Sequence, residues 1–270
     1  MQIIGQDKLI SWIDSCTLDT FPHSFILEGE EGSGRHIISK YIAEHLNLDW
    51  IDITNNISFD TINEIMLKPQ PCVYFIEGAK LTDRQENALL KFLEEPTKNA
   101  FIIMSCNSLS QLKPTVINRC ESRKLIYSYS DLYNFCHDDK VVNIVRTPGQ
   151  VIKLRDMKYE EIDKLCNTII DRIAGANYPN VLTITDKIAF DRDADGYDFD
   201  CFIGVLFYNV RKRLIEADGE DYFKLFKLYT ATKNLDYCKQ TVTHIDCHKL
   251  MDNYLTEIKL MMMYNDARRV

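Results

Sequence analysis

One stretch, residues 25–36 (F-I-L-E-G-E-E-G-S-G-R-H), constrains the fold more than any other part of this chain. Its apolar start is typical of a buried strand, and the glycines that follow permit tight turns with positive φ. Apolar residues then recur at helical spacing from residue 37 to residue 46. A strand, a glycine loop and a helix in this order can bind a polyphosphate through backbone N–H groups at the helix N-terminus.

The loop lacks the two chemical side chains of the phosphate-binding pattern G-x-x-x-x-G-K-[ST]. Gly29 and Gly34 take the glycine positions, but Arg35 replaces the lysine and His36 replaces the hydroxyl residue. A planar guanidinium does not reproduce a compact ammonium, and imidazole is a poor substitute for the oxygen that Mg²⁺ prefers. We therefore expect a degenerate nucleotide site, with an ordinary glycine-rich turn as the alternative.

Composition limits the classes of function. The 270 residues are 46% hydrophobic, enough for two or three domains, and the net charge of −8 argues against tight DNA binding by this chain alone. Nine cysteines without a C-x-x-C pair indicate reduced thiols, and Cys72, Cys106 and Cys120 are expected in the core. No stretch is long and apolar enough for a membrane span, so we expect a cytoplasmic protein without membrane contact.

A second apolar run, residues 72–77, ends in Glu77. In nucleotide-hydrolysing proteins of this architecture, an acid at such a strand end organises Mg²⁺, and a second acid follows to polarise the attacking water. Here the second position is Gly78. Acidic residues at strand ends are also common without a function, so Glu77 alone does not indicate a Mg²⁺ site, and the assignment depends on the neighbouring motifs.

Further elements follow in regular order. Thr82 and Gln85 form a capping-box pattern that opens a helix at residues 83–95. The pattern then predicts a buried strand at residues 100–105, with the amide of Asn107 at its tip, and a last strand at residues 123–127.

These motifs resemble a known family. The run L-T-D-R-Q-E-N-A-L-L-K-F-L-E-E-P at residues 81–96, then F-I-I-M and P-T-V-I-N-R-C, is similar to the AAA+ clamp-loader subunits of DNA polymerase. Among these it most resembles the delta-prime type of bacterial DNA polymerase III. The resemblance is good for residues 5–120, and beyond them it rests on length and helical character. It implies an α/β P-loop (RecA-like AAA+) domain with a parallel sheet, a small helical lid domain and a C-terminal helical collar domain.

The resemblance also assigns roles to residues. It places Glu77 and Gly78 at the two acidic Walker B positions and Asn107 near the sensor-1 site. It makes Arg119, in N-R-C where the family has S-R-C, an arginine finger that reaches the ATP site of a neighbouring subunit. The Walker A loop then comprises Gly29, Gly32, Gly34, Arg35 and His36.

Two departures from the family stand out. Relatives carry a four-cysteine zinc module between the loop helix and the Walker B strand, whereas residues 49–71 contain no cysteine, so no zinc is predicted. Active relatives also have an arginine-bearing sensor-2 helix. Here residues 146–150 read R-T-P-G-Q, and no arginine stands at the start of the helix that follows.

From residue 130 the pattern is helical. We expect domains at residues 1–128, 129–177 and 178–270, with the best boundary at the glycine–proline break of residues 175–179. Two apolar stripes of the last domain fit either an internal core, which we favour, or subunit contacts in a collar. They comprise Phe202, Val205, Leu206 and Val210, and Leu250, Tyr254, Ile258 and Met261.

Two other patterns carry weak metal signals. Residues 191–196 (D-R-D-A-D-G) resemble a Ca²⁺ loop, but Phe202 stands where the bidentate glutamate would be. The spacing of Cys238, His244, Cys247 and His248 fits no standard zinc signature. We predict a metal site at neither.

The functional hypothesis is a catalytically silent clamp-loader subunit of the delta-prime kind. In this hypothesis the loop can bind ATP or ADP without hydrolysing it, and Arg119 acts as an arginine finger in the ATP site of a neighbouring subunit. The resemblance implies ATPase (gamma/tau-type) and delta-type subunits as partners, the sliding clamp indirectly, and weak primer–template DNA contact. The alternatives are an active AAA+ motor subunit and a nucleotide-sensing adaptor outside replication. A small-molecule P-loop kinase is disfavoured because the lid lacks the expected arginine pairs.

Overall fold

The computed structural model describes residues 3–68, 71–78, 81–98, 100–157, 159–174, 198–241 and 247–266. The chain divides into two compact units. The first comprises Met1–Phe135 with Thr147–Gly149, and the second comprises Cys136–Arg146 with Gln150–Val270.

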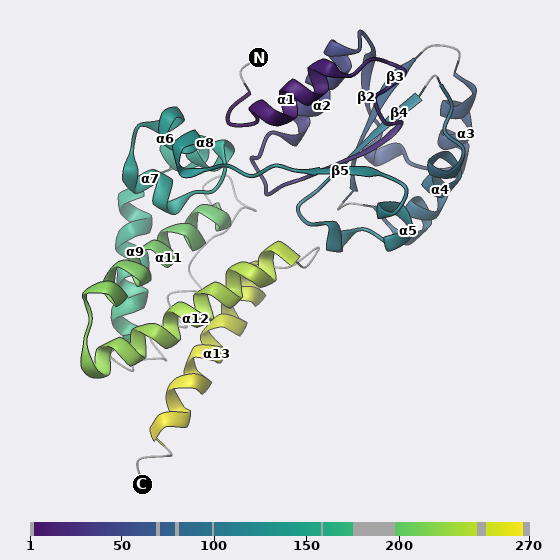
Figure 1. Cartoon of the computed structure of the whole chain (residues 1–270). Coiled ribbons are helices and arrows are strands. Elements are labelled where there is room, and N and C mark those ends of the chain that lie inside the picture. The colour runs from purple at the N-terminus through teal and green to yellow at the C-terminus, as the bar shows by residue number, and fades with distance from the viewer. Residues whose placement is uncertain are drawn as a thin grey trace. The chain divides into compact units, whose positions relative to one another are not determined.

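The first unit is built on a five-stranded parallel sheet (Figure 1) with the strand order β2-β3-β4-β1-β5. The strands are β1 (Ser24–Glu28), β2 (Asp49–Asp52), β3 (Cys72–Glu77), β4 (Ala100–Cys106) and β5 (Glu121–Lys124). The central strands β1, β3 and β4 are buried along nearly their whole length, as in parallel sheets covered on both faces. This confirms the predicted α/β domain with a parallel sheet.

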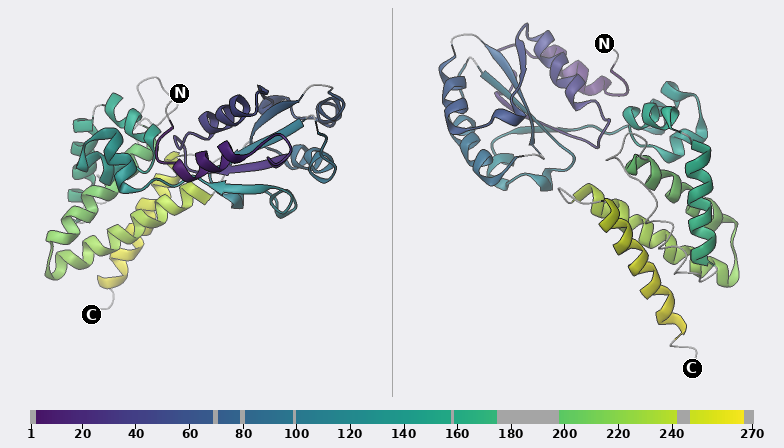
Figure 2. Two further views of the ribbon diagram at one scale, coloured as in Figure 1. Left: turned by 45° about the horizontal axis from the view of Figure 1, so that its top comes forward. Right: turned by 180° about the vertical axis from the view of Figure 1, so that it is seen from behind.

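Alternate strand residues face two separate cores. Phe25, Phe75 and Ile103 pack with helices α1 (Asp7–Ser15) and α2 (Arg35–His45) on one face. The other face, with residues such as Ile26 and Met104, packs against α3, α4 and α5. Figure 2 shows these helices on opposite sides of the sheet. The remaining bounds are α3 (Phe59–Leu67), α4 (Asp83–Glu94), α5 (Pro114–Ile117) and the short 3-10 turns Thr54–Asn56 and Leu109–Gln111.

Local sequence signals explain several boundaries. The hydroxyl of Thr82 accepts a hydrogen bond from the Gln85 N–H, and the Gln85 side chain accepts one from the Thr82 N–H, which confirms the predicted capping box. Ser58 caps α3 in the same manner by accepting from the Thr61 N–H at 3.1 Å.

The helical part of the chain contains α6 (Tyr129–Cys136), α7 (Asp139–Ile144), α8 (Pro148–Asp156), α9 (Tyr159–Ala174), α11 (Phe199–Glu216), α12 (Gly219–Thr241) and α13 (Cys247–Asp266). Within the second unit, α11 packs on α9 and α12, and α12 packs on α13 (Figure 1). The stripe Phe202, Val205, Leu206 and Val210 is fully buried, and Leu250, Tyr254 and Ile258 are buried as well. These residues form an internal core, whereas the further division into lid and collar stays a prediction.

The last strand lies earlier than predicted. Glu121–Lys124 pairs with β1, and the apolar residues Leu125 and Ile126 that suggested residues 123–127 follow the strand. A polar edge strand is held in the sheet by its backbone hydrogen bonds, so its side chains show little of the apolar pattern from which a strand is predicted. The expected break at 175–179, the Ca²⁺-like loop at 191–196 and His244 lie outside the described residues. The side chains of Cys247, His248 and Met261 also lie outside them.

The predicted core cysteines behave as small apolar residues. Cys72 and Cys106 are buried and Cys120 is half-buried. Burial raises the pKa of Cys106 and of Cys120 to about 12. Among the helices that the structure describes, none has the length and apolar composition to cross a bilayer.

Candidate functional site

The predicted loop lies at the carboxyl ends of the central strands. The β1–β4 register pairs Glu28 with Cys106, and the Gly29 N–H donates to the Cys106 carbonyl at 2.9 Å. The β3–β4 register aligns Glu77 with Ser105. Because the strands are parallel, the loop after β1, the acid at the end of β3 and the amide after β4 share one edge of the sheet.

Backbone conformation explains the glycine at the end of the loop. Gly34 is the N-cap of α2 and has φ = 80°, in the left-handed region that other residues rarely adopt. Gly34 therefore turns the chain from the loop directly into α2. The sequence-predicted order of strand, glycine loop and helix is confirmed.

The loop is braced from outside by residues 147–149, which belong to the same unit. The Thr147 hydroxyl donates to the Glu31 carbonyl at 2.9 Å, and the Gly149 N–H donates to the Gly32 carbonyl at 3.0 Å. A Cβ on Gly149 would lie 2.4 Å from the Gly32 Cα, so only glycine fits this approach. The brace is a tertiary feature that the sequence pattern did not predict.

A third contact comes from the chain after β5. The Tyr127 hydroxyl donates to the Ser33 carbonyl at 2.5 Å, and burial raises the pKa of Tyr127 to about 12. Successive loop carbonyls are thus held by neighbouring groups, which fixes the backbone of the loop.

Arg35, at the lysine position, points its guanidinium into the site. Its Nη1 donates to Asn107 Oδ1 at 2.7 Å, so the loop residue and the predicted sensor-1 residue are directly linked. Burial lowers the pKa of Arg35, and the nearby charge of Glu77 opposes that shift. The three predicted residues therefore lie together, with the arginine bonded to the amide.

His36, at the hydroxyl position, packs on aromatic rings. Its ring centroid lies 4.3 Å from that of Phe75 and 5.1 Å from that of Trp50. Its Nε2 is 3.8 Å from Asp52 Oδ2. Partial burial lowers the pKa of His36, although Asp52 acts in the opposite direction. The imidazole thus rests against these rings with 51% of its side chain exposed.

The second acidic position is tightly packed. A Cβ on Gly78 would lie 2.9 Å from Leu112 Cδ2 and 3.1 Å from the Ser105 carbonyl oxygen. Leu112 is buried, and the second contact is with the backbone of β4. Any larger side chain at residue 78 would have to displace this packing.

Arg119, the predicted finger, lies in a different place, just after α5. Its Nη1 donates to the Thr115 carbonyl and its Nη2 to Glu94 Oε1, both at 2.7 Å. The side chain is 35% exposed. Of the predicted site residues, Arg119 is thus the one held at the surface by contacts with α4 and α5.

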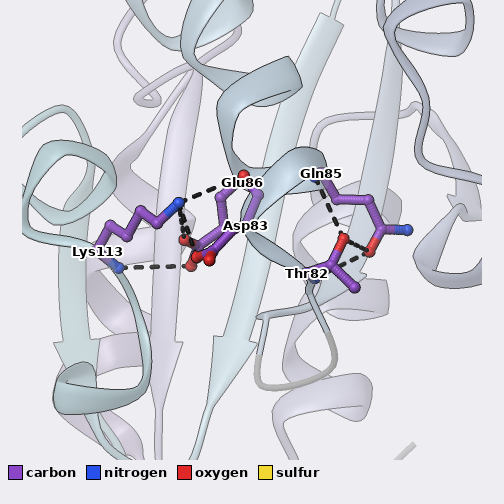
Figure 3. A network of polar contacts seen from close by, with 5 residues as sticks. All are labelled: Thr82, Asp83, Gln85, Glu86 and Lys113. Atoms are coloured by element: carbon purple, nitrogen blue, oxygen red, sulfur yellow. Dashed lines mark hydrogen bonds and ion pairs between the residues drawn. The ribbon is translucent and has the colours of Figure 1, made fainter.

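Sequence reasoning missed a polar network that links α4 to the start of α5 (Figure 3). Lys113 Nζ lies 2.9 Å from Asp83 Oδ1 and 3.5 Å from Glu86 Oε2, and the Lys113 N–H donates to Glu86 Oε1 at 3.4 Å. Glu86 is buried. One feature of the sequence could have indicated this network: Glu86 lies on the apolar face of α4, three residues before the buried Leu89.

The one arginine in the segment where the resemblance places the sensor-2 helix, residues 146–150, is paired within the second unit. Arg146, just before α8, donates to both carboxylate oxygens of Asp236 within the second unit. In the described part of the chain, no group of three or more histidine, cysteine or acidic residues is arranged to hold a metal ion.

The strand order, the glycine loop after β1 and the acid at the end of β3 define a P-loop nucleotide-binding fold of the AAA+ type. Residues 52–126 match the model of a family described as DNA polymerase III, delta subunit. Together with the relatives described next, this match shows that the chain is related to the AAA+ clamp-loader subunits of DNA polymerase III, as its motifs predict.

Curated relatives include gamma and delta-prime subunits. DNA polymerase III subunit gamma of Buchnera aphidicola is 28% identical over 170 residues, 50% of this chain and 47% of the relative. Subunit gamma/tau of Mycoplasma pneumoniae is 22% identical over 224 residues, 68% of this chain and 32% of the relative. Subunit delta' of Haemophilus influenzae is 40% identical over 50 residues, 18% and 15% of the two chains. The chain thus spans less than half the length of these relatives.

Solved structures with a distant likeness come from Thermotoga maritima. A DNA polymerase III gamma subunit-related protein has 16% identity and a TM-score of 0.46, covering 94% of this chain and 98% of its own. The RuvB Holliday junction branch migration motor has 15% identity and a TM-score of 0.45, covering 94% and 88%. The fold assignment therefore rests on the strand order.

Proposed function

We propose that this chain acts in a DNA polymerase III clamp loader as a subunit of the delta-prime kind. In this role it does not hydrolyse ATP, and it supplies Arg119 to the ATP site of a neighbouring ATPase subunit. The single observation that carries the silent-site part is the packing at Gly78. The glycine leaves this position without a water-polarising acid, and a Cβ there would press on Leu112 Cδ2 and on the Ser105 carbonyl oxygen of β4.

The loop side chains support the same proposal. The guanidinium of Arg35 is bonded to Asn107, and the imidazole of His36 is packed on Phe75 and Trp50. Loss of general-base action alone typically removes about 10²–10⁴-fold of rate. With the phosphate lysine and the Mg²⁺ hydroxyl also replaced, we expect no useful turnover, although ATP or ADP can still occupy the braced loop.

Arg119 has the properties that a finger needs. It stands at the end of a short helix, its guanidinium is partly exposed, and it is not one of the groups that hold the loop of its own chain. In GTPase systems a finger supplied in trans is worth roughly 10³–10⁵ in rate. The partners in this proposal are gamma/tau-type and delta-type subunits, with the sliding clamp reached through them and primer–template DNA contacted only weakly.

Mg-ATP turnover by the isolated full chain tests the silent-site proposal. We expect no turnover above a blank without protein, for the wild type and for Arg35→Ala alike. Steady hydrolysis by the wild type that Arg35→Ala abolishes would show an active site in this chain.

The second candidate is an active motor subunit, and one observation favours it. The matches that extend over half of the chain or more include gamma and gamma/tau subunits, whereas the delta' match covers 50 residues. The same turnover assay separates the candidates, because a motor subunit must hydrolyse ATP with its own loop.

A further inference from the structure

The contact between Arg119 and Glu94 points to a function for the carboxylate as well as for the arginine. Glu94 ends α4, directly after the buried Leu93, and its side chain is 52% exposed. Its Oε1 accepts from Arg119 Nη2 at 2.7 Å while the Thr115 carbonyl accepts from Nη1 at the same distance. The guanidinium is thus folded back on its own chain from two directions.

The frame beneath this contact is set by the fold. Leu93 on α4 and Val116 on α5 are buried in one hydrophobic cluster. Lys113 joins the start of α5 to Asp83 and to the buried Glu86 of α4. Because these contacts anchor both helices, the backbone positions of Glu94 and Arg119 are fixed relative to each other. The two side chains therefore start within reach of one another.

We propose that Glu94 is a positioning residue that holds the Arg119 guanidinium on its own subunit until a neighbour's bound nucleotide competes for it. This inference rests on the proposed function of Arg119 as a finger. Carboxylate and phosphate oxygens both accept charge-assisted hydrogen bonds from a guanidinium, so Glu94 and a phosphate compete for the Nη2 group of Arg119. A polyphosphate carries the larger charge and wins the exchange, after which the Glu94 carboxylate is released to solvent.

The strength of the hold fits a reversible device. An exposed ion pair is typically worth about 0.2–1 kcal/mol, which corresponds to at most about 5-fold in an equilibrium constant. Such a contact lowers the fraction of molecules in which the Arg119 guanidinium is released from Glu94, but it does not prevent Arg119 from binding a neighbour's nucleotide. It also weakens as salt rises, because exposed charges are screened.

The test uses the full chain reconstituted with the gamma/tau-type ATPase subunit of the same replisome, and measures Mg-ATP hydrolysis while this chain is titrated. The variants are Glu94→Gln, Arg119→Ala and the double variant, with Glu95→Gln, at the exposed next position, as the matched control. We expect Glu94→Gln to lower the half-maximal concentration of this chain by about 2–5-fold at low salt, with the maximal rate unchanged. The gain should shrink at high salt and vanish in the Arg119→Ala background.

Two outcomes would overturn the inference while leaving the finger in place. Glu94→Gln could match Glu95→Gln, or it could reduce the maximal rate, while Arg119→Ala still abolishes stimulation. If Arg119→Ala stimulates as well as the wild type, the proposed function itself fails, and the inference fails with it.

A measurement on the isolated chain checks the contact without a partner. Rotation of the Arg119 guanidinium, followed by NMR of its side-chain nitrogens, should become faster in Glu94→Gln and stay unchanged in Glu95→Gln. Thermal melting of each variant verifies that the fold is retained. Equal rotation rates in the wild type and Glu94→Gln would overturn the proposal.

Discussion

Two arginines that the sequence predicts as site residues, Arg35 in the glycine loop and Arg119 after α5, are held by the structure in opposite ways. Arg35 is half-buried and bonded to Asn107, an acceptor inside its own domain. Arg119 is held at the surface by Glu94 and the Thr115 carbonyl. The comparison teaches that the two guanidinium groups differ in access: the loop arginine bonds within its own site, and the arginine after α5 is held at the surface, as the proposed finger requires.

The largest stability effect is expected where the loop is braced. Gly149→Val would force a side chain against the Gly32 backbone, and overpacking of this kind costs about 1–3 kcal/mol or more. Urea unfolding should therefore show a lower midpoint for Gly149→Val. Thr147→Ser keeps the hydroxyl that bonds Glu31 and should stay within about 0.5 kcal/mol of the wild type. Equal midpoints for Gly149→Val and the wild type would mean that the brace is not formed.

Removing the half-buried loop arginine should cost less. Arg35→Met leaves Asn107 Oδ1 without its donor, and because this hydrogen bond is only partly buried we expect a loss near the lower end of the range of about 1–3 kcal/mol for an unmade buried hydrogen bond. Thermal or urea unfolding of the isolated chain measures this loss. Arg119→Met, which removes an exposed ion pair, should change stability by less than about 1 kcal/mol. A larger loss for Arg119→Met than for Arg35→Met would reverse the comparison.

The α4–α5 corner can be weakened separately from the loop. Lys113→Met removes the ammonium that pairs with the buried Glu86 but keeps the N–H that donates to it, and we expect a loss of about 1–2 kcal/mol because part of the network is solvent-exposed. Lys98→Met, at an exposed lysine after α4, is the matched control and should have no measurable effect. If both variants unfold at the same urea concentration, the network does not anchor α5.

The smallest effect is a dependence on alkaline pH, of roughly 1 kcal/mol between pH 8 and about pH 9.5. Burial raises the pKa of Cys106 to about 12, whereas an unfolded thiol ionises near about 8.5. The stabilising contribution is therefore complete below about pH 8.5 and is lost as pH rises toward about 12, at up to about 1.4 kcal/mol per pH unit.

Cys106→Ala should flatten this alkaline decline in urea unfolding measured at pH 8 and about pH 9.5. The exposed Cys238 supplies the control, since Cys238→Ala should leave the decline as it is. An unchanged slope in Cys106→Ala would mean that this thiol ionises as readily in the folded state as in the unfolded chain.

Much of the first unit follows from local patterns. The strand at Cys72–Glu77 and the capping box at Thr82 were predicted at their observed positions, because apolar runs and caps are written in neighbouring residues. The polar strand Glu121–Lys124 was misplaced, since its pairing depends on the β1 backbone.

The directions of site side chains could not be predicted in the same way. The sequence predicted Arg35, Asn107 and Arg119 as site residues, but it did not predict that Arg35 bonds Asn107 or that Arg119 bonds Glu94 on another helix. The brace at Gly149 is also set by tertiary packing, since its partner Gly32 is remote in sequence.

The ATPase rate of a reconstituted assembly tests the central claim most directly, with wild-type chain compared with Arg119→Ala and with Arg84→Ala, an exposed arginine on α4, as the control. If Arg119 is the finger, Arg119→Ala should lower the partner's DNA-stimulated rate by about 10³-fold or more, and Arg84→Ala should leave it unchanged. Equal rates with wild-type and Arg119→Ala chains would contradict the account.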